Sequence, residues 1–153
     1  MNKKINIGIV GFGRIGRNLL RLGYNDPRFN FVGISDFAEP ESLFYLLGHD
    51  SLYGPIGDQI ELKDNYIYIG KQKIRLLPSA GPDSLPWDSI GIDIIVDCTG
   101  RIWSRSDLDK YLYAGAKRVI VTKPPKDPVD RIVVMGLNDK EISADDKIIS
   151  SSS

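Results

Sequence analysis

Hydrophobic and polar positions follow one another along the chain in patterns that predict alternating strands and helices. In KINIGIV, near the N-terminus, isoleucines alternate with other residues and lead into the glycine-rich run GFGRIG, which predicts a strand and a tight turn. Residues 14–24 place apolar side chains on one broad stripe and are followed by Asn25-Asp26-Pro27, so a helix is expected that ends before the proline. A second strand, FNFVGISD, is expected to end at Asp36.

The middle of the chain contains a short helical segment and a period-2 segment. Residues 41–48 predict the helix. Residues 60–77 read IELKDNYIYIGKQKIRLL, and their alternation breaks at Asp64-Asn65 and at Gly70. This pattern predicts a small antiparallel ribbon with two turns. The proline-bounded residues 78–86 are expected to form a loop.

The second half returns to alternating strands and helices. IGIDIIVDCTG predicts a buried strand, and RVIVT, RIVVMG and the final IIS predict three more. Between them, residues 104–115 predict a helix with Ser104 or Ser106 as N-cap and Gly115 as its stop. The whole order predicts an α/β fold in which residues 1–153 form a single Rossmann-like domain: a doubly wound, mostly parallel sheet with the ribbon as an insertion.

Composition excludes several classes of function. The chain has 153 residues, 42% hydrophobic and 26% charged, with 20 basic side chains against 20 acidic ones. This is the size and composition of one ordinary soluble domain, and its balanced charge favours neither nucleic acid nor a membrane surface as partner. The apolar run of the N-terminus is broken at Asn6 and Gly8, so it predicts a strand rather than a signal peptide.

The chain has one cysteine, Cys98, and one histidine, His49. A single cysteine excludes an internal disulfide and fits a cytoplasmic protein, and one cysteine with one histidine makes a metal site unexpected. Cys98 ends an apolar strand, where a small buried hydrophobic residue is the ordinary interpretation. His49 follows a helix, where a solvated or capping histidine is typical. We therefore predict no catalytic residue and no metal ligand in this chain.

The chemistry lies in the motif Gly11-x-Gly13-x-x-Gly16. In a dinucleotide-binding turn the first glycine allows the tight turn, the second lets the backbone approach the pyrophosphate, and the third lets the helix pack closely on the strand. The motif follows a strand and opens a helix whose free N–H groups and dipole favour an anion. The alternative is that the three glycines only make a tight strand-to-helix turn.

Asp36 strengthens the dinucleotide interpretation because it follows Gly16 by 20 residues and ends the second strand. A carboxylate there can accept hydrogen bonds from both hydroxyls of the adenosine ribose and would repel a 2′-phosphate. The sequence therefore predicts NAD, in preference to NADP, as the cofactor. In the alternative reading Asp36 is a solvated loop residue.

Beyond these motifs, the chain resembles the glyceraldehyde-3-phosphate dehydrogenases, phosphorylating type. The resemblance rests on GIVGFGRIGRNLLR, ISD, YLLGHDSLYG, LPWDSIGIDIIVDCTG, AGAKRVIVTKPPKDP, VVMGLN and KIIS, which come in the family's order and cover nearly the whole chain. It implies an N-terminal NAD-binding domain of a glycolytic aldehyde oxidoreductase. The cofactor-binding residues that follow from the motif and from the resemblance are Gly11, Gly13, Arg14, Ile15, Gly16, Asp36, Thr99, Gly100 and Thr122. The resemblance places Arg14 and Ile15 at the pyrophosphate turn, and the two threonines with Gly100 near the far end of the dinucleotide.

Several positions depart from the family pattern around the adenine. Ser79-Ala80-Gly81-Pro82 stands where the family usually has Glu-Arg-Asp-Pro, so an arginine contact is absent. The aromatic residue that often follows the Thr-Gly pair is Ile102 here, although the adjacent Trp103 could substitute for it. Tyr53 replaces a frequent histidine, and Lys123-Pro124-Pro125 partly replaces Ser-Ala-Pro. These departures predict a looser adenine pocket.

The resemblance also implies that this chain lacks the catalytic half. KIISSSS aligns Ser153 with the residue just before the family's nucleophilic cysteine, and the catalytic domain would follow. We therefore expect the 153-residue chain alone to be inactive, the remainder of the dehydrogenase to be its partner, and the full-length parent to form a homo-oligomer. The alternative is a stand-alone NAD-binding or interaction module. An aspartate-semialdehyde dehydrogenase is disfavoured by GFGRIGR together with VVMGLN.

Overall fold

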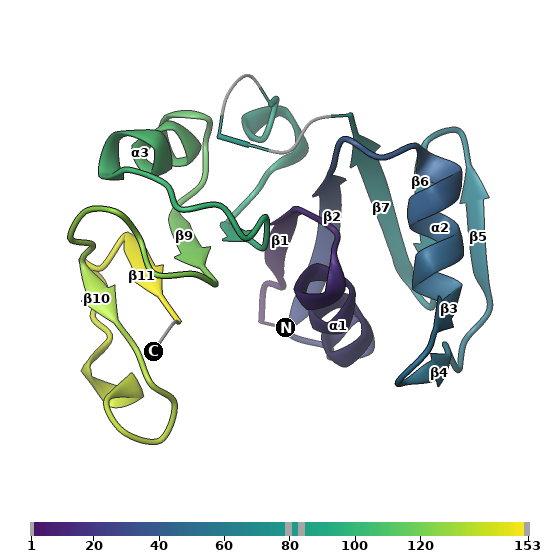
Figure 1. Cartoon of the computed structure of the whole chain (residues 1–153), viewed down its shortest axis with the longest axis horizontal. Helices are drawn as coiled ribbons and strands as arrows, with labels where there is room; N and C mark the ends of the chain where they lie inside the picture. The colour runs from purple at the N-terminus through teal and green to yellow at the C-terminus, as the bar shows by residue number, and fades with distance from the viewer. Residues whose placement is uncertain (1, 79–80, 83–84, 152–153) are drawn as a thin grey trace.

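A single large sheet organises the molecule. The computed structural model describes residues 2–78, 81–82 and 85–151. In this described part the sheet has nine strands in the order β10-β11-β9-β8-β1-β2-β7-β6-β5 (Figure 1). Its strands are β1 (Ile5–Val10), β2 (Phe29–Ser35), β5 (Ile60–Lys63), β6 (Tyr66–Ile69), β7 (Gln72–Leu77), β8 (Ile94–Asp97), β9 (Arg118–Val121), β10 (Arg131–Ile132) and β11 (Ile148–Ser150).

The chain winds outward from β1 in both directions. It runs from β1 to the parallel strand β2 on one side and later returns to β8, which pairs in parallel with β1 on the other side. From β8 the parallel order continues through β9 and β11 to β10. The carboxyl ends of β1 and β8 therefore form a topological switch point, where open α/β sheets bind ligands. The predicted doubly wound, mostly parallel α/β sheet is confirmed.

Helices pack on both faces of the sheet, as double winding requires. The helices are α1 (Arg14–Gly23), α2 (Pro40–Gly48) and α3 (Arg105–Tyr113). Buried residues of α1 and α2 share one hydrophobic core with Ile7 and Ile9, whereas α3 shares a second core with Val10. Because successive side chains of a strand point to opposite faces, these two cores lie on the two sides of β1.

The largest fully buried side chain of the second core is that of Trp87. Gly8 of β1 and Gly33 of β2 are register partners, so two positions without a side chain lie next to each other beneath the indole. A Cβ at Gly8 would lie 2.6 Å from the Trp87 ring, and one at Gly33 would lie 2.9 Å from it. The absence of side chains at the two glycines thus lets the indole ring pack flat against the backbone of β1 and β2.

The predicted antiparallel ribbon is present as β5, β6 and β7. Asp64 and Asn65 both have positive φ, which suits the tight turn between β5 and β6. The ribbon is more than an insertion, however, because β7 also pairs in parallel with β2 and so extends the main sheet. The buried side chain of Gln72 reinforces this junction: Phe31 N–H donates to its Oε1 (2.8 Å), and its Nε2 donates to the Tyr24 carbonyl (3.0 Å).

Other predicted elements are found with different lengths. The helix expected over residues 104–115 is α3; Ser104 is its N-cap in a capping box with Asp107, and Gly115 follows its end with a φ of +113°. The strand expected over residues 131–136 is wrong beyond Ile132, because a turn follows in which Asn138 Oδ1 accepts from Val134 N–H. The turn-rich segment after α2 contains a two-stranded pair that we did not predict, β3 (His49–Asp50) with β4 (Gly54–Pro55).

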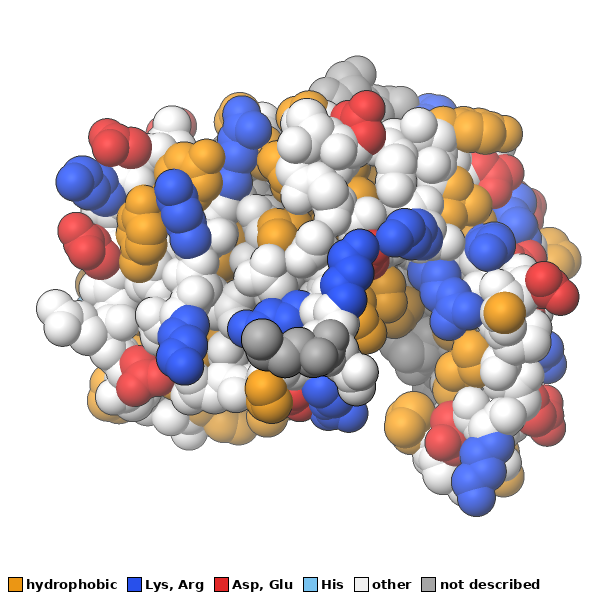
Figure 2. Space-filling model, turned by 180° about the vertical axis from the view of Figure 1, so that it is seen from behind, with side chains coloured by type: hydrophobic (Ala, Val, Ile, Leu, Met, Phe, Trp, Pro, Cys, Tyr) orange, Lys and Arg blue, Asp and Glu red, His pale blue; other side chains and the backbone are white. Residues whose placement is uncertain are grey.

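The segment between β10 and β11 projects from the edge of the sheet and includes the short 3-10 helix η2 (Asp139–Glu141) (Figure 1). Beside it lies a hollow of about 520 Å³ (Figure 2). Apolar side chains dominate its lining, which consists of Ile120, Val133, Val134, Met135, Ile142, Ile149 and Ser151. In the described residues, no helix has the length and apolar character that crossing a membrane requires.

Candidate cofactor site

Two glycines of the turn between β1 and α1 are required by close packing. Gly11 has a φ of +84°, and a Cβ there would lie 2.7 Å from the backbone N and Cα of Thr99. A Cβ at Gly16 would collide with the carbonyl oxygen of Gly11. Gly11 thus lets the turn approach the end of β8, and Gly16 lets α1 start directly against the turn.

Gly13 differs from these two because space is open beside it. It is exposed, its φ is −77°, and no atom lies within 4 Å of the position that a Cβ would occupy. Gly13 is also the N-cap of α1, where no side chain accepts a hydrogen bond from the first turn. The exposed Arg14 and Ile15 follow it. A helix start that has neither a side-chain cap nor an acidic residue in its first turn favours an anion.

Asp36 lies directly after β2 and is hydrogen-bonded to the same turn. Phe12 N–H donates to Asp36 Oδ2 (2.8 Å), and Ala38 N–H donates to Oδ1 (2.9 Å). The carboxylate is partly exposed. Since each carboxylate oxygen can accept two hydrogen bonds, both oxygens retain capacity for a ligand's hydroxyl groups. The backbone thus holds Asp36 in place beside the glycine turn and leaves it able to accept a diol.

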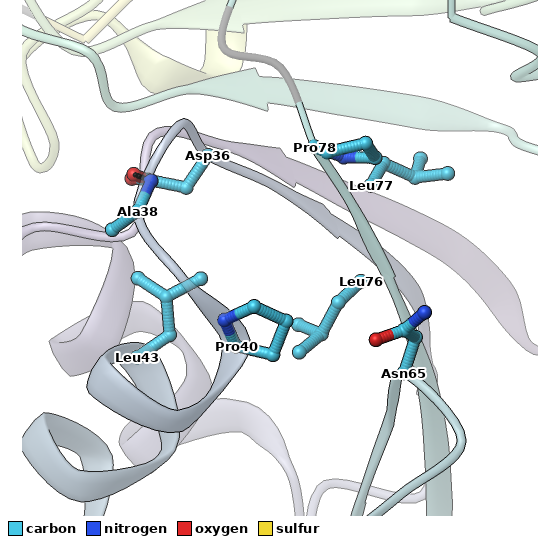
Figure 3. Close-up of a pocket in the computed structure, with 8 residues that line it drawn as sticks. All are labelled: Asp36, Ala38, Pro40, Leu43, Asn65, Leu76, Leu77 and Pro78. Atoms are coloured by element: carbon cyan, nitrogen blue, oxygen red, sulfur yellow. Dashed lines mark hydrogen bonds between the residues drawn. The ribbon is translucent and has the colours of Figure 1, made fainter.

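A small cavity of about 70 Å³ opens beside Asp36 (Figure 3). Its walls come from the loop after β2, the start of α2 and the strand β7, with Asp36 and Pro78 on opposite sides (Figure 3). The lining is mainly apolar and consists of Asp36, Ala38, Pro40, Leu43, Asn65, Leu76, Leu77 and Pro78. Of the departures in the adenine region, Ser79 and Ala80 lie outside the described residues.

The end of β8 is organised by a buried carboxylate, Asp97, which is 3% exposed. Its Oδ1 accepts from Thr99 N–H (3.0 Å) and from Thr99 Oγ1 (2.7 Å). Its Oδ2 accepts from Tyr111 Oη (2.6 Å) and from Trp103 Nε1 (2.7 Å). Thr122, at the end of β9, donates through Oγ1 to the Asp97 carbonyl (2.9 Å). One residue therefore connects α3, the loop after β8 and the loop after β9.

Sequence reasoning did not identify Asp97. A signal was present, because an acidic residue interrupts the apolar run of residues 94–98, and hydrogen-bonding aromatic residues follow it at 103 and 111. A buried carboxylate needs such partners. The finding also explains Trp103, whose indole N–H is committed to Asp97. Ile102, the other position we considered for an aromatic contact, is 63% exposed.

The nine predicted cofactor residues gather at one edge of the sheet. They follow the carboxyl ends of four neighbouring strands, in the spatial order β9, β8, β1 and β2. Thr99 and Gly100, which has a φ of +73°, follow β8, and Thr122 follows β9. Such a gathering at a switch point is the arrangement in which these folds bind nucleotides. The contact of each residue with the cofactor stays a prediction.

Cys98 and His49 have the environments expected of structural residues. Cys98 is 8% exposed, and burial, followed by the nearby Asp97 charge, raises the pKa of its thiol to about 12. His49 is the C-cap of α2. Its Nδ1 lies 3.0 Å from the Tyr45 carbonyl, and its ring stacks on that of Tyr45 with 4.4 Å between centroids. Cys98 follows β8 and His49 begins β3, and no hydrogen bond joins the two side chains in the described structure.

Comparison with known proteins identifies the relatives of this chain. A family model for the glyceraldehyde 3-phosphate dehydrogenase NAD-binding domain matches residues 5–105. The glyceraldehyde-3-phosphate dehydrogenase 1 of Trichormus variabilis is 44% identical over 137 residues, which are 88% of this chain and 40% of that protein. The corresponding enzyme of Mycoplasma pneumoniae is 40% identical over 152 residues, 99% of this chain and 45% of that protein. The enzyme of Geobacillus stearothermophilus is 37% identical over 134 residues, which are 88% of this chain and 40% of that protein. The chain thus spans less than half the length of these relatives.

Proposed function

The chain belongs to the glyceraldehyde 3-phosphate dehydrogenase family, whose NAD-binding domain it contains, and from this premise we propose how it binds its cofactor NAD. The pyrophosphate lies at the start of α1, against Gly13 and the N–H groups of Arg14 and Ile15. The observation that carries this proposal is the open space beside Gly13 at a helix N-terminus without a side-chain cap. A phosphate there accepts hydrogen bonds from the backbone and interacts favourably with the helix dipole.

The adenosine ribose is bound by Asp36 in this proposal. The carboxylate already accepts from the backbone N–H groups of Phe12 and Ala38, so a 2′,3′-diol meets an acceptor that is held in place before the ligand arrives. A 2′-phosphate would face the same carboxylate at close range and be repelled, which supports a preference for NAD over NADP.

The opposite end of the dinucleotide lies toward the loops after β8 and β9. Thr99, Gly100 and Thr122 follow these strands, and Asp97 connects the two threonines through its side chain and its carbonyl. The residues fit a dinucleotide because the glycine turn lies directly against Thr99, so a ligand extended from Asp36 across Gly13 continues over this loop. When bound, NAD supplies the hydride acceptor; these residues supply only its orientation.

The activity of the whole protein is a further proposal. We propose that the full-length protein is a cytoplasmic, homo-oligomeric oxidoreductase of glycolysis that acts on glyceraldehyde 3-phosphate, and that its nucleophile and base lie outside these 153 residues. Support comes from the family match and from the environment of Cys98, whose thiol is buried and has a pKa raised to about 12. Such a thiol is a poor nucleophile near neutral pH, because the thiolate is the reactive form.

Calorimetric titration of the 153-residue chain with NAD and NADP tests the proposed site. Wild type should bind NAD more tightly than NADP, and Asp36→Ala should weaken NAD binding by about 10- to 100-fold, the value of hydrogen bonds to a charged acceptor. Gly13→Val tests the proposed pyrophosphate contact at the turn. Its side chain enters open space, so it should abolish NAD binding and leave the melting temperature nearly unchanged. Equal affinity for both cofactors, or normal NAD binding by both variants, would contradict the proposal.

A further inference from the structure

Arg101 lies at the mouth of the candidate cofactor site and makes unusual contacts there. Its guanidinium carbon is 5.5 Å from the centroid of the Phe37 ring and 5.7 Å from that of Trp103. Phe37 directly follows Asp36, whereas Arg101 is on the loop after β8. Arg101 therefore bridges the two loops between which the adenosine half of a dinucleotide would enter.

The position of Arg101 is held by the buried carboxylate of Asp97, the last residue of the strand that precedes the loop. Asp97 accepts from Thr99 on one side of Arg101 and from Trp103 on the other. In addition, Arg101 N–H donates to Thr99 Oγ1 (3.2 Å). The backbone of the loop is thus fixed at both flanks, while the Arg101 residue itself is exposed. An exposed, flexible side chain on a fixed backbone can exchange one partner for another without disturbing the fold.

The cavity beside Asp36 is too small to enclose a purine. Its volume is about 70 Å³, about half that of a cavity of about 150 Å³ that holds benzene, and benzene is smaller than adenine. The base attached to a ribose at Asp36 must therefore lie across the mouth of the cavity, against side chains of the two loops. Among the described residues, the exposed Phe37 (64% exposed) and Arg101 offer flat groups there.

We propose that Arg101 is a cofactor-binding residue that stacks its guanidinium plane on the adenine ring of NAD, exchanging the Phe37 ring for the purine. A planar, weakly hydrated guanidinium can lie flat on an aromatic face, whereas an ammonium group interacts with such a face only as a compact charge. The arginine thus takes the place of the aromatic contact that Ile102 does not supply. This inference rests on the proposed binding of NAD at the sheet edge.

The test is calorimetric titration of the full 153-residue chain with NAD and with ADP-ribose, which keeps the adenosine half and lacks nicotinamide. Arg101→Ala should weaken both ligands about tenfold, which lies within the range measured for loss of a planar group stacked on a base. Arg101→Lys is the matched control, since it keeps the charge and removes the plane, and it should lose nearly as much as Arg101→Ala. Arg101 is exposed, so both variants should fold, and equal melting temperatures verify this.

Three results would overturn the inference. Wild-type affinity in Arg101→Ala would show that the guanidinium does not touch the cofactor. Full recovery in Arg101→Lys would show that Arg101 contributes only its charge to the pyrophosphate. A loss for NAD without a loss for ADP-ribose would place Arg101 at the nicotinamide end. In each case Asp36→Ala still weakens NAD if the proposed function is right, whereas a wild-type chain that binds no NAD refutes both.

Discussion

Replacing Asp97 by alanine should be among the most destabilising single substitutions at the sheet edge. The carboxylate is 3% exposed and accepts four hydrogen bonds from three residues. Asp97→Ala leaves the hydroxyl of Tyr111, in a fully buried residue, and the indole N–H of Trp103 without this acceptor. A buried donor that loses its partner costs about 1–3 kcal/mol, so the total is about 3 kcal/mol. For a domain of this size each kcal/mol lowers the melting temperature by about 2–4 °C.

Thermal unfolding monitored by circular dichroism should therefore show a decrease of about 6–12 °C in Asp97→Ala. Tyr111→Phe removes one donor and should cost about 1 kcal/mol. In the double variant the two effects should not add, because phenylalanine leaves no hydroxyl to satisfy. NAD affinity should also fall, since Thr99 loses the acceptor that holds its loop. A melting temperature of Asp97→Ala within about 2 °C of wild type, or strict additivity with Tyr111→Phe, would refute this reasoning.

Three further predictions concern the lone cysteine and the activity of the chain. Because burial raises the Cys98 pKa to about 12, the native thiol stays protonated, while the unfolded thiol ionises near its ordinary pKa. Iodoacetamide at pH 8 should therefore label the protein quickly in urea and hardly at all without urea. Rapid labelling of the native protein would contradict this. By the same linkage the native state binds the extra proton between the two pKa values, so this group's contribution to stability should fall as pH rises above about 9. The 153-residue chain should produce no NADH from glyceraldehyde 3-phosphate, NAD and phosphate, read by absorbance at about 340 nm. Its only thiol is buried, and among the described residues its side-chain hydrogen-bond partner is Thr122 rather than a base. Turnover that disappears in Cys98→Ser would show the opposite.

Local signals in the sequence were sufficient for the first strand–helix–strand unit, β1 to β2. The strand, the glycine turn and α1 could be read directly, because each glycine and the proline after the helix act on their immediate neighbours. Asp36 could be placed because 20 residues and one strand separate it from Gly16. The pairing of β7 with β2 could not be predicted, since it joins positions far apart in the chain, as does the hydrogen bond between Gln72 and Phe31, which are 41 positions apart.

The candidate site was likewise predicted where it depends on motifs and missed where it depends on packing. Gly13 belongs to a known spacing, and the structure leaves open space beside it. Asp97 belongs to no motif, and its role follows from three partners that only the folded chain brings together. Arg101 shows the same limit: its contact with Phe37 joins loops after two different strands, and no periodicity connects those positions.

The packing of Trp87 on Gly8 and Gly33 means that substitutions at these three positions constrain one another. A methyl group on either glycine would come within 3 Å of the indole ring, so neither glycine can change while the tryptophan stays. A smaller side chain at 87 would leave an unfilled volume, with a penalty of about 3–5 kcal/mol for loss of a buried tryptophan side chain. Evolution can therefore replace this packing only by substituting the tryptophan and a glycine together, and such simultaneous substitutions are rare. We therefore expect amino-acid sequences to diverge mainly at exposed positions, while these three residues stay unchanged.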